Sequence, residues 1–168
     1  ASGDLFGYWQ FFPTGEDPWG KVTVWGIGEV VASHVEGIAV GERLYGFLPM
    51  ASHVVMKPGE LSERGFTDAM PHRSELPGLY NYYARTQSEP AQLQVLEDQR
   101  CIFFPLFMTG YVIADLLLDN DWFGARQMVI GSASSKTGFS TAAFIRAAGF
   151  KGAIVGLTSD LNVAFSEA

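Results

Sequence analysis

The sequence predicts an α/β fold in which a β-barrel part precedes a strand–turn–helix–strand unit. Two observations carry this prediction. Short segments rich in β-forming residues, separated by glycine turns, occupy residues 21–57. Further along, residues 127–158 change from an apolar run to a small, hydroxyl-rich turn, then to apolar residues at helical spacing, and then to a second apolar run. With 168 residues, of which 48% are hydrophobic, the chain can bury a core.

Composition and charge narrow the class of protein. The formal net charge is −7, and we find no basic stripe of the kind that binds nucleic acid. Cys101 is the single cysteine, which excludes a disulfide framework and a cysteine-rich zinc site. We expect no apolar run of membrane-spanning length and no signal peptide. These observations predict a cytoplasmic protein with no nucleic acid and no membrane as partner; a homodimer is left open, and a small-molecule substrate is implied only by the resemblance described below.

The first part of the chain predicts a small sheet. Residues 1–20 are rich in aromatic side chains, interrupted by proline and glycine, and we expect them to pack in a core. Residues 21–35, 44–48 and 52–57 predict three strands, with glycines inside the first that suggest a bulge or a tight bend. Short strands joined by glycine turns are typical of a small, partly open β-barrel.

Residues 56–100 are unusually rich in ionisable and aromatic side chains. We predict an inserted loop over about residues 59–100, and long loops in compact domains are often functional. His72 and Tyr83 are our candidates for proton donation, because these residue types exchange protons at catalytic sites. The alternative is a surface excursion whose tyrosines pack on the barrel.

The C-terminal part predicts half of a nucleotide-binding βαβ unit. Residues 128–130 form an apolar run that we expect to be a strand buried on both faces. Residues 137–148 then predict a helix, and residues 153–157 predict a second strand. The N-terminus of such a helix binds phosphate through unpaired N–H groups and its partial positive charge.

The turn before this helix departs from the usual dinucleotide fingerprint, G-x-G-x-x-G. The three glycine positions carry Ala133, Ser135 and Gly138, so only the third glycine is kept. Alanine and serine are small enough to let a pyrophosphate approach, and we predict contacts from Ser135, Lys136, Thr137 and Gly138. The alternative is an ordinary βαβ turn with nothing bound.

The residues at the end of the second strand indicate whether the bound cofactor is NAD or NADP. NAD enzymes place a carboxylate there to hold the ribose 2′-hydroxyl. Here Thr158 and Ser159 occupy that position, and hydroxyls can donate to a 2′-phosphate. Lys136 adds a charge-assisted contact. We therefore predict NADP as the cofactor, while Asp160, which follows closely, leaves NAD open.

Metal ligands are too scattered to form a catalytic site. His34, His53 and His72 are far apart in the sequence, and no pair has the H-x-x-x-H spacing. We predict no bound metal.

Two resemblances add to these observations. Three segments resemble, in the same order, parts of the zinc-free, quinone-reductase-like medium-chain dehydrogenase/reductases. Residues 28–58 resemble the GroES-like catalytic domain, residues 101–118 resemble a stretch with a Thr-Ala-Tyr step, and residues 133–138 resemble the Ala-Ser-Ser-x-x-Gly turn. A closer resemblance is to DUF2855, a family of uncharacterised proteins related to those reductases. The segments that carry it are residues 44–58, 66–85, 105–117 and 129–144.

The resemblance implies a fold and a reaction. Residues 1–105 would be a partial GroES-like barrel, and residues 106–168 would be the start of a Rossmann domain, with an N-terminal segment and most of the nucleotide domain lacking. The implied reaction is NAD(P)H-dependent hydride transfer to a carbonyl or an activated double bond without zinc, with Thr109 near the nicotinamide. The alternatives are a non-catalytic scaffold and a nucleotide-binding sensor with the same fold.

Overall fold

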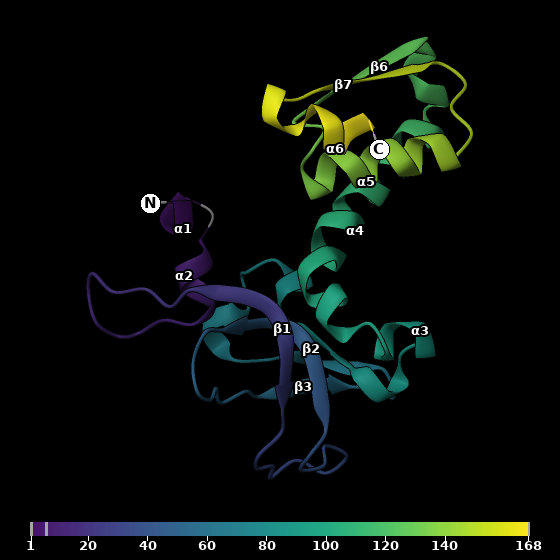
Figure 1. Cartoon of the computed structure of the whole chain (residues 1–168). Helices are drawn as coiled ribbons and strands as arrows, with labels where there is room; N and C mark the ends of the chain where they lie inside the picture. Colours follow the sequence, from purple (N-terminus) through teal and green to yellow (C-terminus); the bar gives the residue numbers. More distant parts are fainter. Residues whose placement is uncertain (1, 6, 168) are drawn as a thin grey trace. The chain divides into compact units, whose positions relative to one another are not determined.

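The computed structural model describes residues 2–5 and 7–167, and the chain divides into two compact units, Ala1–Cys101 and Ile102–Ala168. Figure 1 shows an antiparallel sheet in the first unit and a smaller, parallel sheet in the second. The α/β class predicted from the sequence is therefore confirmed.

The first unit is built on a five-stranded antiparallel sheet with the order β1-β2-β5-β4-β3. The strands are β1 (Thr23–Glu29), β2 (Arg43–Pro49), β3 (Pro58–Leu61), β4 (Gly65–Asp68) and β5 (Tyr82–Arg85). Strands β1 and β3 are the two edges of this order, so the sheet is open; the sequence predicted a partly open barrel, and the structure shows an antiparallel sheet with no barrel closure.

Short helices connect and cover these strands. They are α1 (Ser2–Leu5), α2 (Tyr8–Phe11), η1 (Pro71–Arg73), η2 (Gly78–Tyr80), η3 (Thr86–Ser88) and α3 (Ala91–Gln94). Helix α2 adds Phe11 to an aromatic core together with Phe12 and Phe47. Phe11 is 1% exposed, so the prediction that the aromatic N-terminal stretch packs as core is confirmed for this residue and for Phe12.

The structure confirms the first two strands predicted in residues 21–57 but not the third. β1 and β2 lie where the sequence places the first two strands. The third predicted strand, residues 52–57, is wrong, because the next strand begins only at Pro58. At Lys57 the backbone N–H donates to the side chain of Asp68, to Oδ1 at 3.0 Å, and not to the backbone of a neighbouring strand.

Residues 59–100 are part of the sheet and not a simple loop. They contain nearly all of β3 and the whole of β4 and β5, and β5 pairs with both β2 and β4. Tyr83 on β5 is fully buried and stacks on Phe66 of β4, with 5.7 Å between ring centroids. Gly46 on β2 makes room for this side chain, since a Cβ there would lie 2.4 Å from Tyr83 Cδ1.

The second unit is a strand–turn–helix–strand arrangement, as predicted. Strands β6 (Gln127–Gly131) and β7 (Ala153–Leu157) are parallel and are joined by α5 (Lys136–Ala147). The other elements are α4 (Glu97–Asp119), which begins in the first unit, and η4 (Asp121–Gly124), η5 (Asp160–Asn162) and α6 (Val163–Glu167).

The predicted burial of β6 on both faces is wrong. Met128 and Ile130 pack on the core formed by Ala114, Ile145 and Phe150, whereas Val129 is 60% exposed. The core residues come from α4, α5 and the segment after α5, and Figure 1 shows both helices on the same side of the β6–β7 sheet. Among the described residues, these helices cover only one face of the sheet.

Helix α4 differs from what we expected. It has 23 residues and, by length and composition, could cross a membrane, although we expected no such segment from the sequence. Only 11% of its most apolar 18-residue window is buried. The helix packs closely on α5 at Gly110, where a Cβ would lie 2.3 Å from Ser140 Oγ.

Candidate functional site

The turn between β6 and α5 is tied to the end of β7. Ser132 adopts a left-handed conformation with φ of 50°, and Ser135 N–H donates to its carbonyl at 2.8 Å. Ala133 N–H donates across to the carbonyl of Leu157 at 3.0 Å. The turn therefore lies at the carboxyl ends of both parallel strands, which is where ligands bind in open α/β sheets.

Ser135 caps helix α5. Its backbone is extended, and its Oγ accepts a hydrogen bond from Gly138 N–H at 3.0 Å. This is the usual arrangement of an N-cap serine. The N–H groups of Lys136 and Thr137 have no partner within the helix, because the first turn of any α-helix leaves such donors open. Lys136 itself is exposed on that turn.

Gly138 has to be glycine. A Cβ at this position would lie 2.6 Å from the Ser132 carbonyl oxygen and 3.1 Å from Ser135 Oγ. The third fingerprint glycine thus lets the turn lie directly on the helix. Gly156 on β7 has a similar role and was not among the residues predicted from the sequence, since a Cβ there would lie 2.7 Å from Ala133 Cβ. A glycine inside a strand was the signal that could have revealed it.

The end of β7 brings a second hydroxyl to the turn. Thr158 Oγ1 donates to Ser134 Oγ at 3.0 Å, although the two residues are 24 positions apart. Ser134 was not among our predicted site residues. Ser159 points its Oγ to its own loop instead, where it accepts from Asn162 Nδ2 at 3.0 Å. The structure therefore joins Thr158, but not Ser159, to the turn by a hydrogen bond.

A largely apolar pocket of about 580 Å³ reaches this turn. Its lining includes the turn and helix residues Ser135, Thr137 and Gly138, and also Trp122 and Phe123 from η4. Four consecutive residues of β6, 128–131, line it as well, so the pocket runs along this strand. Its volume is within the range of small-molecule sites, which is roughly 300–1,000 Å³.

Thr109 lies on α4 within the second unit. Its Oγ1 donates to the Pro105 carbonyl at 2.9 Å, and its side chain is exposed. The next residue, Gly110, makes the close contact with α5 described above. The placement of Thr109 near a nicotinamide stays a prediction.

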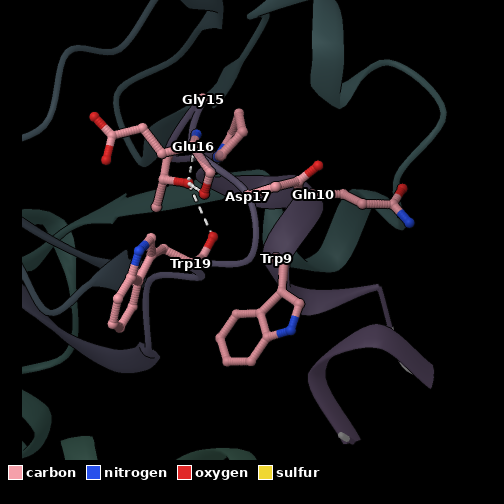
Figure 2. A pocket seen from close by; sticks show the side chains of 8 residues that line it. Trp9, Gln10, Gly15, Glu16, Asp17 and Trp19 are labelled. Carbon is pink, nitrogen blue, oxygen red and sulfur yellow. Dashed lines mark hydrogen bonds between the residues drawn. The ribbon is translucent and has the colours of Figure 1, made fainter.

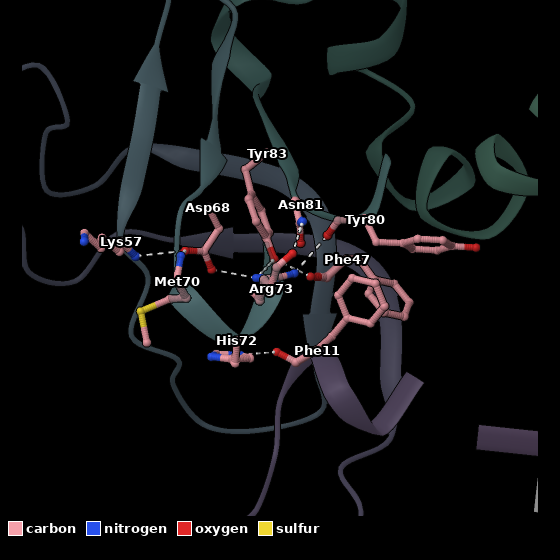
Figure 3. A network of polar contacts seen from close by, with 10 residues as sticks. All are labelled: Phe11, Phe47, Lys57, Asp68, Met70, His72, Arg73, Tyr80, Asn81 and Tyr83. Atoms are coloured by element: carbon pink, nitrogen blue, oxygen red, sulfur yellow. Dashed lines mark hydrogen bonds and ion pairs between the residues drawn. The ribbon is translucent and has the colours of Figure 1, made fainter. Parts of the chain in front are cut away.

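His72 and Tyr83 lie in the first unit, around a buried arginine that Figure 3 shows. Arg73 Nη1 lies 2.6 Å from Asp68 Oδ2 and donates to Tyr83 Oη at 3.1 Å. Arg73 Nη2 donates to the Tyr80 carbonyl at 2.9 Å. Tyr83 Oη in turn donates to the Phe47 carbonyl at 2.6 Å. This network joins β2, β4, β5 and two short helices.

The two candidate proton donors differ in access to solvent. Tyr83 is 0% exposed, and burial raises the pKa of its hydroxyl to about 12, although the Arg73 guanidinium acts in the opposite direction. His72 is exposed, and its Nε2 lies 3.1 Å from the Phe11 carbonyl oxygen. The position of Tyr83 is that of a core residue; catalytic roles for both side chains stay predictions.

A second pocket, of about 370 Å³, lies in the N-terminal segment (Figure 2). Its lining includes Trp9, Glu16, Asp17 and Trp19. A side-chain hydrogen bond from Thr14 Oγ1 to the Trp19 carbonyl, at 2.9 Å, closes the loop around it. The pocket contains none of the residues that the sequence predicted for a site.

Within residues 2–5 and 7–167, no group of three or more histidine, cysteine, aspartate or glutamate side chains is arranged to hold a metal ion. The absence of zinc stays a prediction to be tested on the protein.

Comparison with known proteins gives a family match. The model of a family described as "Protein of unknown function (DUF2855)" matches residues 1–168. No curated protein and no solved structure matches the chain.

Proposed function

The chain belongs to the DUF2855 family, and from that premise we propose that it is a zinc-free, medium-chain-reductase-like protein that binds a nicotinamide dinucleotide at the turn between β6 and α5. In this proposal the second unit is the start of a Rossmann domain, and the open antiparallel sheet of the first unit is a GroES-like part. The protein acts on a small-molecule substrate in the cytoplasm.

The observation that carries the proposal is the geometry of Gly138. Its lack of a side chain lets the Ser132 carbonyl come to within 2.6 Å of where a Cβ would stand, so the turn lies flat on the start of α5. The third glycine of the dinucleotide fingerprint has this packing role. An ordinary connection between a strand and a helix does not require such a close approach.

The residues of the turn fit a pyrophosphate. The open N–H groups of Lys136 and Thr137 belong to a helix of 12 residues, whose N-terminus carries a partial positive charge. The ammonium group of Lys136 is exposed beside them and can add a charge-assisted contact. Ser135, as the cap, holds Gly138 in place, and its hydroxyl hydrogen remains to donate to a ligand.

The preference for NADP rests on the end of β7. Thr158 and Ser159 stand where NAD enzymes have a carboxylate, and Lys136 can offer a positive charge to a 2′-phosphate. Asp160, exposed in η5, is the residue that would favour NAD. We favour NADP because hydroxyls and an ammonium group are better partners of a phosphate dianion than a carboxylate is.

A bound nicotinamide would supply the hydride for reduction of a carbonyl or an activated double bond. The chain's own contribution is a proton for the reduced substrate, and we assign it to His72, whose side chain is exposed and whose imidazole ring can carry and donate a proton. Tyr83 would contribute only through the sheet that it stabilises, because its hydroxyl is held by Arg73 and Phe47. Thr109 is assigned to the nicotinamide end of the site.

A binding titration tests the proposal. The purified protein is titrated with NADPH and with NADH at matched ionic strength, followed by nucleotide fluorescence and by calorimetry. We expect saturable binding of both, with NADPH the tighter ligand. Replacing Lys136 with Ala should weaken NADPH more than NADH; equal weakening would place the lysine on the shared pyrophosphate. Tighter binding of NADH would refute the NADP preference.

A non-catalytic scaffold is the second candidate, and the composition of the turn favours it. Ala133 and Ser135 replace two fingerprint glycines, and Ala133 fills the space left open by Gly156. In that case the folded protein would bind neither dinucleotide in the titration. A nucleotide-binding sensor would bind one of them and show no turnover with carbonyl or quinone substrates.

A further inference from the structure

The pocket along β6 in the second unit is lined by uncharged side chains throughout the part of the chain that the structure describes. Its volume is about 580 Å³, and most of its wall is aliphatic or aromatic. Ile113 and Leu117 come from α4, Ile145 comes from α5, and Val129 and Ile130 come from β6. A charge without a partner is costly to bury among such side chains, whereas burial of a hydrocarbon is favourable. A ligand that complements this pocket is therefore uncharged and mostly apolar.

A strained turn holds an aromatic ring at one end of the pocket. Asp121, Trp122 and Phe123, just before β6, have left-handed backbones with φ of 47°, 54° and 50°, a conformation that bulky residues rarely adopt. Trp122 ties the turn to the core, since its ring centroid lies 5.1 Å from that of Phe150. Phe123 lines the pocket and is 68% exposed. Strained residues of this kind cluster where ligands are clamped, and a ligand in the pocket would cover the Phe123 ring.

The other end of the pocket, after β6, carries hydroxyl groups. Thr137 and Thr141 of α5 line it, and Thr141 Oγ1 donates its hydrogen to the Thr137 carbonyl at 2.7 Å. The Thr137 hydroxyl can donate to an acceptor on a ligand. Between the two ends, residues 128–131 of β6 extend over about 10 Å, which an extended chain of about eight carbon atoms spans.

We propose that this pocket binds an uncharged, elongated molecule with a hydrocarbon body and one hydrogen-bond-accepting end. The body lies along β6 against Phe123, and the accepting end meets the Thr137 hydroxyl. Taken together with the function proposed above, on which this step rests, the ligand is the substrate, an aldehyde or ketone with a medium-length hydrocarbon chain. Ile113, in the pocket wall, is one helical turn from Thr109, which that function assigns to the nicotinamide.

Three probes test the class of ligand on the unmodified protein without any dinucleotide. Methyl octyl ketone is uncharged, nonanoate has the same octyl chain with a negative charge, and acetone has the carbonyl without the chain. Binding is followed by calorimetry and by the fluorescence of Trp122, which lines the pocket and is the only tryptophan in residues 102–168. We expect saturable binding of methyl octyl ketone and a dissociation constant at least about tenfold higher for nonanoate and for acetone. Tighter binding of nonanoate than of the ketone overturns the inference.

Two substitutions test where the ligand lies. Phe123→Asn removes the ring, and because asparagine tolerates a left-handed backbone, the melting temperature should not fall. We expect the dissociation constant for methyl octyl ketone to rise at least about tenfold. Val129→Thr keeps a β-branched side chain of similar size but places a hydroxyl on the apolar wall, so we expect a rise of about threefold.

Phe165→Asn is the matched control. Phe165 lies in α6, is 58% exposed and is not part of the pocket wall, so this change also removes an exposed ring from the second unit. It should leave the dissociation constant for the ketone unchanged. Unchanged ketone binding in both Phe123→Asn and Val129→Thr overturns the inference, and Val129→Thr carries the test if Phe123→Asn does not fold.

The remaining outcomes concern other occupants and the proposed function. Light scattering that finds a dimer for the unmodified protein and a monomer for Phe123→Asn assigns the pocket to a second copy of the chain and overturns the inference. Binding of NADPH or NADH without binding of the ketone overturns this inference alone. Binding of the ketone without binding of either dinucleotide supports the pocket as assigned, and overturns the proposed function together with the substrate role of the ketone.

Discussion

At the scale of single residues, Arg73 is a buried charged side chain of the first unit. It is 1% exposed, and its guanidinium lies over the rings of Phe11, Phe12 and Tyr83 while it pairs with Asp68. A buried charge of this kind is tolerated because Asp68 pairs with it and both Nη atoms are hydrogen-bonded, although its Nε has no hydrogen-bond partner among the described residues. The dense ionisable groups that suggested a catalytic loop are explained in large part by this network.

Removing the arginine should therefore be costly. Arg73→Met leaves the Asp68 carboxylate buried without its cation, and we expect the free energy of unfolding to fall by about 3–5 kcal/mol. Denaturant titration measures the loss. Arg64→Met, at an exposed arginine, is the matched control and should change stability by no more than about 0.5 kcal/mol. Similar losses in both variants would contradict a structural role of the buried pair.

Tyr83 gives the same network a pH dependence. Burial raises the pKa of its hydroxyl to about 12, from the ordinary value of about 10 in the unfolded chain. Because the folded-state pKa is the higher one, the stabilisation is fully present below pH about 10 and is lost as pH rises towards about 12. Chemical unfolding across this range should show a fall in stability that is smaller in Tyr83→Phe. An identical fall in that variant would assign the effect to other groups.

At the scale of elements, the conformation of the turn between β6 and α5 requires a residue without a side chain at position 138, which is Gly138. A Cβ there meets backbone, the Ser132 carbonyl oxygen at 2.6 Å, which cannot move aside cheaply. The short apolar strands and the helical spacing around it are local features. For that reason the sequence predicted this unit well, to within a residue or two at most ends.

Gly138→Ala should push the turn away from the helix. We expect a loss of about 1–3 kcal/mol in unfolding free energy, as for other overpacked sites, together with weaker NADPH binding. Gly131→Ala is the control for stability, since a Cβ there meets nothing within 4 Å. If both glycine variants are equally stable, the close approach does not hold the turn.

Substitutions at Ser135 can distinguish its role in capping α5 from its role in binding a negatively charged ligand. Ser135→Ala removes the bond to Gly138 N–H and should cost about 1 kcal/mol. Ser135→Asp keeps a capping oxygen and suits the helix dipole, so stability should recover, while its negative charge should repel a dinucleotide phosphate. Recovery of both stability and NADPH binding in Ser135→Asp would show that no phosphate lies at this helix N-terminus.

At the scale of the whole molecule, the proposal of a zinc-free protein has a direct consequence. The three histidines are far apart in the sequence, and the described residues contain no cluster of three metal-ligating side chains. Elemental analysis of the purified protein should find zinc well below stoichiometric amounts, and chelators should leave its melting temperature unchanged. A content near one zinc per chain would contradict the prediction.

Several features could be predicted from the sequence by itself because they depend on local patterns of residues. They are the α/β class, the family resemblance, β1 and β2, the helix α5 between two parallel strands, and the turn with Gly138. These features depend on side-chain period and turn chemistry within short windows. Tertiary structure alone decided that residues 59–100 complete a sheet, because β4 and β5 are four residues long and pair with strands far away in the chain. It also decided that Tyr83 is buried, that β6 is covered on one face, and that Ser134 meets Thr158. Each of these depends on contacts between distant residues, which local periodicity does not record.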